Sequence, residues 1–113
     1  MDNIGNNKLS NVLKLWEPEL DDFQNLVKDM SLVDSPYKNE FNDIRSLVKK
    51  KPNQDSKEKI HLLIDELNHF RIIFEKIVED DDVRELYIKQ GLLYKSVALQ
   101  TRILSKLKTR HRL

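Results

Sequence analysis

The sequence predicts an all-α protein, a four-helix bundle that ends in a long helical hairpin with coiled-coil character. Its 113 residues include only two glycines and three prolines, fewer than the turns of a β-sandwich or an α/β fold require. Apolar residues recur at alternating steps of three and four, the spacing that places side chains on one helix face. A chain of this length forms one domain, so we expect a single helical core over residues 9–109.

The two ends of the chain are expected to lie outside this core. Residues 1–8 are polar and rich in asparagine, which predicts a disordered lead-in, and residues 110–113 form a basic tail. The N-terminal residues lack the pattern of a signal peptide, and no apolar run is long enough to span a membrane. Cysteine is absent, which excludes disulfides and thiolate chemistry. We therefore expect an intracellular protein, cytoplasmic or nuclear.

The first main helix is expected over residues 18–30, after a short helical turn at residues 9–16. Pro18 is tolerated in a first helical turn, and the carboxylates of Glu19, Asp21 and Asp22 suit the positive end of the helix dipole. Its apolar stripe consists of Trp16, Leu20, Phe23, Val27 and Met30.

A second helix is expected over residues 36–50. Ser35 is placed as its N-cap and Pro36 in its first turn, while the lysines at residues 49–51 and then Pro52 mark its end. Its apolar stripe consists of Tyr37, Phe41, Ile44 and Val48.

The third helix, over residues 56–79, has the clearest pattern in the chain. Asp55 with Glu58 three residues later resembles a capping box, and an unbroken a/d heptad seam follows. The seam consists of Ile60, Leu63, Leu67, Phe70, Phe74 and Ile77.

The last helix is expected over residues 83–109. Four carboxylates at residues 79–82 interrupt the third helix, since they suit a new helix start better than a helix end. Asp82 is the expected N-cap, with Glu85 in the capping-box position. A continuous helix over residues 56–109 is the alternative, because the acidic run contains neither glycine nor proline.

Two apolar stripes lie on different sides of the last helix, and this pattern carries the functional prediction. The first, which we expect to face the core, consists of Leu86, Leu93, Val97 and Leu104. The second, on roughly the opposite side, consists of Ile88, Leu92, Leu99 and Ile103. An apolar face without a partner in its own chain indicates an interface, so we predict that the second stripe and Trp16 bind another chain.

Charge is distributed unevenly along the chain. Residues 1–83 contain 12 Lys and Arg against 18 Asp and Glu, whereas residues 84–113 contain 8 against 1. A basic segment can meet the phosphates of a nucleic acid, although cations also suit the last turn of a helix. The predicted basic patch consists of Arg102, Lys106, Lys108, Arg110 and Arg112.

No motif in the sequence indicates catalysis or a cofactor. Phosphate-binding glycine loops and nucleophile elbows are absent. His61, Asp65 and His69 share the four-residue spacing of metal ligands on a helix, and His69 could accept a phosphoryl group, but a solvated polar face explains both histidines better. We predict a non-enzymatic interaction subunit of a multiprotein assembly, forming a homo- or hetero-oligomer, with nucleic-acid binding as the alternative.

Overall fold

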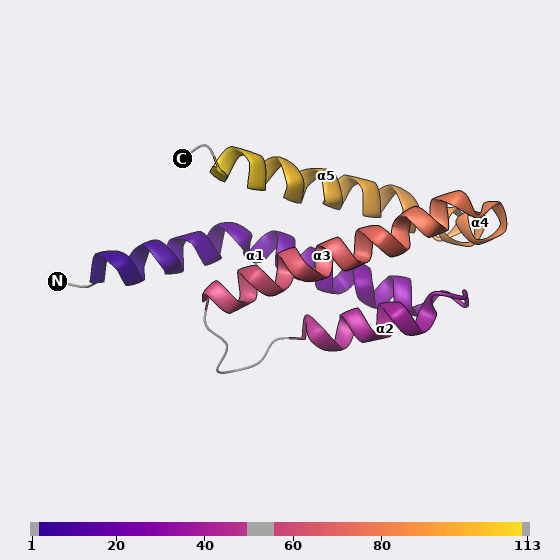
Figure 1. Ribbon diagram of the computed structural model, residues 1–113, viewed down its shortest axis with the longest axis horizontal. Helices are drawn as coiled ribbons and strands as arrows, with labels where there is room; N and C mark the ends of the chain where they lie inside the picture. The colour runs from indigo at the N-terminus through magenta and orange to yellow at the C-terminus, as the bar shows by residue number, and fades with distance from the viewer. Residues whose placement is uncertain (1–2, 50–55, 112–113) are drawn as a thin grey trace.

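The computed structural model describes residues 3–49 and 56–111, and their side chains over residues 16–49 and 57–108. Within these ranges the chain forms five helices and no strand, which confirms the all-helical class (Figure 1). The helices are α1 (Asn3–Leu32), α2 (Lys38–Leu47), α3 (Ser56–Glu79), α4 (Asp81–Lys89) and α5 (Leu92–His111).

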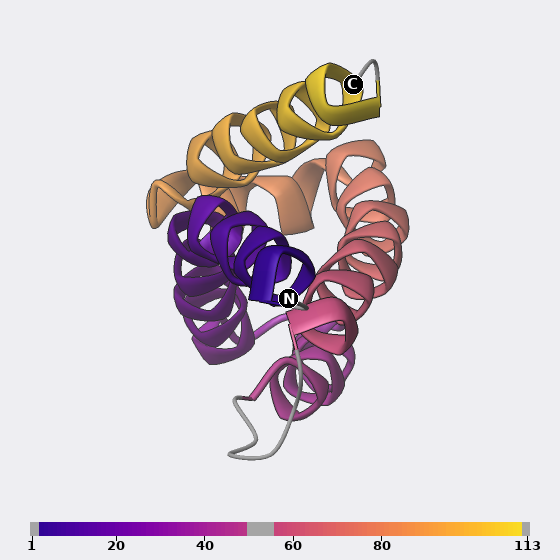
Figure 2. The same cartoon turned by 90° about the vertical axis from the view of Figure 1, so that its left-hand side faces the viewer.

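Helix α1 is the common packing partner of three other helices. It packs against α2, α3 and α5, and α2 also packs against α3. Helix α4 joins the end of α3 to the start of α5, at the opposite end of the molecule from the C-terminus (Figures 1 and 2). Among the residues that the structure describes, α5 packs mainly on α1 and α4, so the close hairpin expected between the last two long segments is not seen.

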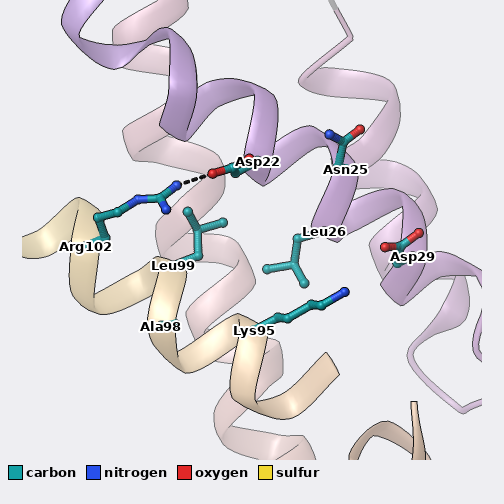
Figure 3. Close-up of a pocket in the computed structure, with 8 residues that line it drawn as sticks. All are labelled: Asp22, Asn25, Leu26, Asp29, Lys95, Ala98, Leu99 and Arg102. Carbon is teal, nitrogen blue, oxygen red and sulfur yellow. Dashed lines mark hydrogen bonds and ion pairs between the residues drawn. The ribbon is translucent and has the colours of Figure 1, made fainter. Parts of the chain in front are cut away.

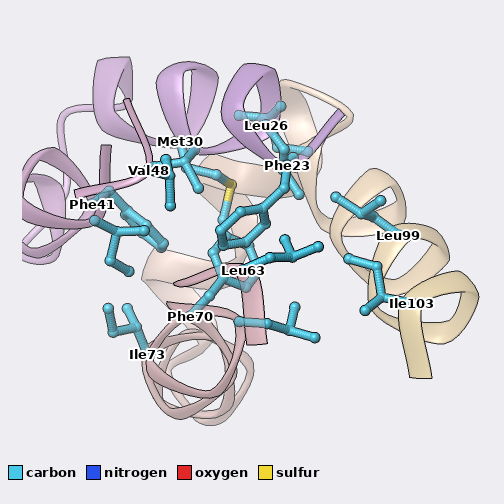
Figure 4. Packing of buried hydrophobic residues seen from close by; sticks show 14 of the residues in the cluster. Phe23, Leu26, Met30, Phe41, Val48, Leu63, Phe70, Ile73, Leu99 and Ile103 are labelled. Carbon is cyan, nitrogen blue, oxygen red and sulfur yellow. The ribbon is translucent and has the colours of Figure 1, made fainter. Parts of the chain in front are cut away.

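The core confirms the apolar stripes predicted for the first three long segments. Phe23 of α1, Phe41 of α2 and Phe70 of α3 are fully buried, and the Phe70 ring lies 5.6 Å from Phe23 and 5.5 Å from Phe41, centroid to centroid (Figure 4). Tilted aromatic pairs at this separation add roughly 0.5–1.5 kcal/mol each to the gain from burial. Three helices are therefore fixed to each other through one phenylalanine cluster.

Helix α1 is much longer than the sequence suggested. It begins at Asn3, inside the segment expected to be disordered, and it passes through Pro18 without ending. Pro18 removes one backbone donor, but its ring lies on the exposed side while Trp16 and Leu20 are buried beside it. The burial of this apolar face outweighs the lost hydrogen bond, and the expected helix restart at Pro18 is wrong.

Helix α2 begins two residues later than predicted. Its N-cap is Tyr37, whereas the Ser35 hydroxyl accepts a hydrogen bond from the Tyr37 backbone N–H at 3.2 Å and also bonds the Tyr87 hydroxyl at 2.5 Å. The end of α2 is tied to α1, because the Gln24 side-chain amide donates to the Val48 carbonyl. The predicted cap at Asp55 lies outside the described residues.

The predicted last helix is two helices. Asp80, and not Asp82, caps α4, and its carboxylate accepts from the Val83 backbone N–H at 3.2 Å. Helix α4 ends at Lys89, and Gly91 follows with a φ of +70°, a conformation that other L-residues rarely adopt. Both the single helix over residues 83–109 and the continuous helix over residues 56–109 are therefore wrong.

Candidate functional site

The two apolar stripes of the last segment have the reverse of the expected orientation. Leu92, Leu99 and Ile103 are at most 6% exposed and belong to the core, and Ile88 is half-buried. Trp16, predicted as a partner anchor, is also a core residue. Apart from half-buried Ile88, the predicted partner-binding set is thus covered by its own chain, because α1 is 30 residues long and packs along α5, whereas the prediction assumed a short first helix.

The stripe expected in the core is open on the surface instead. Val97 is 49% exposed, Leu104 38% and Leu86 of α4 39%. On α5, half-buried Leu93 and Leu107 extend this stripe at both ends and touch the core on one side. We call the following set the α5 seam: Leu93, Val97, Gln100, Leu104 and Leu107. Its steps of four and three are those of an a/d heptad.

Gln100 is the polar member of the α5 seam, and sequence reasoning missed it. Its side-chain nitrogen is buried and has no hydrogen-bond partner. A buried amide without a partner costs roughly 1–3 kcal/mol, and native proteins contain few of them. The signal that could have found it is its position, since Gln100 falls in the heptad between Val97 and Leu104, where a polar residue commonly fixes the register of a helix pair.

A buried carboxylate connects α1 to the basic end of α5. Glu19 is 4% exposed, and its Oε1 accepts from the Lys106 ammonium at 2.7 Å and lies 3.5 Å from Arg102 Nε. Arg102 also pairs with Asp22, and the Lys106 nitrogen lies 5.4 Å from the centre of the Trp16 ring. Sequence reasoning placed Glu19 only as a helix-start charge, because its partners lie more than 80 residues away in the chain.

These contacts change the predicted basic patch. Arg102 and Lys106 are engaged with carboxylates of α1, while Lys108 is exposed. Arg110 lies in α5 but its side chain is outside the described set, and Arg112 lies outside the described residues altogether. The structure therefore brings together two of the five predicted cations, and it brings them to acidic partners.

A shallow groove runs between α1 and α5 on the side where Arg102 meets Asp22 (Figure 3). One hollow of about 320 Å³ has Leu26 and Leu99 among its lining residues, and Asp29 and Lys95 also line an adjoining hollow of about 440 Å³. In the first hollow the carboxylates come from α1 and the cations from α5. The lining of this hollow therefore contains charged groups of both signs.

The histidines of α3 lie on its polar side. Both His61 and His69 are exposed, and His69 Nδ1 lies 3.4 Å from Glu66 Oε1. Among the described side chains, no three metal-ligating groups come together. No helix in the described part of the chain is long and apolar enough to cross a membrane.

Searches with protein-family models, of curated proteins and of solved structures found no match to this chain.

Proposed function

We propose that this protein is a non-enzymatic interaction subunit, and that the α5 seam is the surface by which it binds another protein chain. The observation that carries the proposal is the combination of exposed Val97 and Leu104 with the unpartnered Gln100 amide between them. Side chains at heptad spacing fit the holes of a second helix, so the docked element is a helix of another chain.

The apolar surface that remains exposed on the α5 seam supplies a modest gain on association. Burying a large aliphatic side chain fully is worth roughly 1.5–3 kcal/mol, and Val97 and Leu104 are 49% and 38% exposed. Association itself costs several kcal/mol in lost rotational and translational freedom. The α5 seam therefore supports a reversible contact, to which coiled-coil packing with a partner helix would add the half-buried Leu93 and Leu107.

Nucleic-acid binding through the basic end of α5 is the second hypothesis, and it has less support. Cations bind a nucleic acid by exchanging their counterions for its phosphates. Arg102 already pairs with Asp22 and Lys106 with Glu19, so these two cations have carboxylate partners within the chain. Exposed Lys108 is the described side chain that favours it. A steep loss of duplex binding between low and high salt would support this second function.

The proposed function is tested with the variant Val97→Asp/Leu104→Asp. Each change places a carboxylate on an already exposed position, so we expect a folded protein with an unchanged helical circular dichroism spectrum. The matched control is Ile72→Asp, because Ile72 of α3 is 57% exposed and lies outside the α5 seam.

We expect light scattering and affinity capture to show association for the wild type and for Ile72→Asp, and none for Val97→Asp/Leu104→Asp. A folded double variant that associates as strongly as the control would refute the proposal. Loss of association in both variants would also count against the α5 seam, because the effect would then not depend on position.

A further inference from the structure

The α5 seam is arranged nearly symmetrically about Gln100. Leu93 lies seven residues before it and Leu107 seven residues after it, while Val97 lies three before and Leu104 four after. If a second α5 runs antiparallel and is centred on the same residue, Leu93 meets Leu107 of the second copy. Val97 then meets Leu104 of the second copy, and the apolar positions of one helix match those of the other.

The chemistry of Gln100 suits the centre of such a pair. A two-fold axis places the same residue of both copies opposite itself. A primary amide carries both a donor and an acceptor, so two amides that meet across an axis can satisfy each other. The Gln100 nitrogen is buried without a hydrogen-bond partner in the single chain, and rotation of its side chain toward the axis would provide one.

The charges at the two ends of α5 favour the antiparallel direction. At one end, residues 79–95 contain five carboxylates against three cations, which are Arg84, Lys89 and Lys95. Helix α5 itself contains no carboxylate, and its last turns contain Lys108 and Arg110 in addition to Lys106, which pairs with Glu19 of its own chain. Helix α4 and the C-terminus lie at opposite ends of the molecule (Figure 1). An antiparallel pair therefore places the basic end of one copy near the acidic end of the other, whereas a parallel pair places like charges together.

We propose that the partner at the α5 seam is a second copy of this chain, whose α5 lies antiparallel to the first with the two Gln100 side chains at the two-fold axis. This inference rests on the proposed function and names its partner. From Leu93 to Leu107 the contact is about 21 Å long at 1.5 Å per residue. Such a contact is smaller than a standard dimer interface, so the dimer is expected to be reversible, with a dissociation constant in the micromolar range.

The position of the axis is tested by charge exchange at Gln100. Gln100→Glu and Gln100→Lys each place two like charges opposite each other, so each alone is expected to dimerise at least about tenfold more weakly than the wild type in sedimentation equilibrium. An equimolar mixture pairs opposite charges and is expected to recover the dimer. The matched controls are Asn39→Glu and Asn39→Lys, which change an exposed amide of α2 and should leave dimerisation unchanged.

The direction of the pair is tested by cross-linking, which the absence of native cysteine makes specific. Gln100→Cys is expected to form a disulfide-linked dimer under mild oxidation, because a residue on the axis lies near its own copy. Leu93→Cys alone should not cross-link, but a mixture of Leu93→Cys with Leu107→Cys should. Asn39→Cys is the control, which should form no disulfide-linked dimer because Asn39 of α2 lies away from the α5 seam.

Several results would overturn this inference. The inference is wrong if the wild type stays monomeric at several hundred micromolar. If the Val97→Asp/Leu104→Asp change nevertheless abolishes capture of a different protein, the proposed function stands and only the second copy is excluded. Self-cross-linking of Leu93→Cys without cross-linking to Leu107→Cys would show a parallel pair. Folded Gln100→Glu and Gln100→Lys variants that dimerise as the wild type does would remove Gln100 from the axis.

Discussion

The Lys106 ammonium lies 2.7 Å from Glu19 Oε1, and this ion pair joins the C-terminal half of α5 to α1. The Glu19 side chain is 5% exposed, whereas the Asp22 carboxylate, which pairs with Arg102 nearby, is 52% exposed. The same helices are therefore joined by one buried carboxylate and one open to solvent, so we expect the two to contribute differently to stability.

We expect Glu19→Ala to lower the free energy of unfolding by about 2 kcal/mol, because it leaves Lys106 without its buried carboxylate. Asp22→Ala should cost less than about 1 kcal/mol, since solvent screens its pair with Arg102. Urea titration followed by the fluorescence of Trp16, the single tryptophan, measures both. Equal losses in the two variants would show that the burial of Glu19 does not matter.

We expect Tyr87 to make the fold sensitive to alkali. Burial raises the pKa of Tyr87 above its ordinary 10.0, nearby Tyr37 raises it further, and the hydrogen bond with Ser35 lowers it. The folded chain therefore holds a proton that the unfolded chain releases above about pH 10, so the stability contributed by the neutral phenol is complete below that pH and is lost as the pH rises through the folded pKa.

We expect the free energy of unfolding of the wild type to fall between pH 9 and pH 11 more than that of Tyr87→Phe. At pH 7 the variant should be less stable by about 1 kcal/mol, because it lacks the hydrogen bond to Ser35. Urea titrations at the three pH values make the comparison. Parallel losses in the two proteins would assign the alkaline sensitivity to other groups.

The orientation of α5 is tested by two substitutions on that helix. Leu99 is 6% exposed and Leu104 is 38% exposed. Leu99→Ala should cost about 2–5 kcal/mol by opening a cavity, whereas Leu104→Ala should cost less than about 1 kcal/mol in the isolated chain. Thermal unfolding at low protein concentration measures both. If Leu104→Ala lowers the stability more than Leu99→Ala does, the orientation of α5 predicted from the sequence would be right.

The same helix shows what the sequence could not decide. Periodicity located two stripes on α5, but both are equally apolar, so the pattern alone does not say which one faces the core. That depends on the length of α1, and α1 was underestimated because Pro18 resembles a helix start. For α3 the predicted bounds are those of the structure. For α2 the apolar stripe is right, although the helix (Lys38–Leu47) is shorter at both ends than predicted. Each of these helices has one dominant apolar stripe and only one face to bury.

The candidate site was predicted only in part for a related reason. The chain segment that carries the α5 seam was found from its periodicity, but Gln100 was not. Its heptad position can be read from the sequence, whereas the burial of its amide without a hydrogen-bond partner is seen only in the structure. The ion pairs of Glu19 could not be predicted either, because Lys106 lies 87 residues further along the chain.

Gly91 separates α4 from α5, and its conformation gives a further prediction. A Cβ at this position would meet no other atom within 4 Å, so a substitution there acts through the backbone alone. With φ at +70°, Gly91→Ala should cost about 1 kcal/mol, and Gly91→Asn less, because asparagine tolerates the left-handed region better. Thermal unfolding of the two variants is the measurement, and an alanine variant as stable as the wild type would contradict the expected strain.

The central claim is that another chain covers the α5 seam, and thiol labelling measures this most directly. Val97→Cys and Leu47→Cys give a matched pair, because the native side chains are 49% and 48% exposed and the chain contains no other cysteine. As the protein concentration rises from about 1 µM to several hundred micromolar, across the expected micromolar dissociation constant, the labelling rate of Val97→Cys should fall severalfold while that of Leu47→Cys stays constant. Equal and constant rates for both cysteines over this whole range would contradict the account.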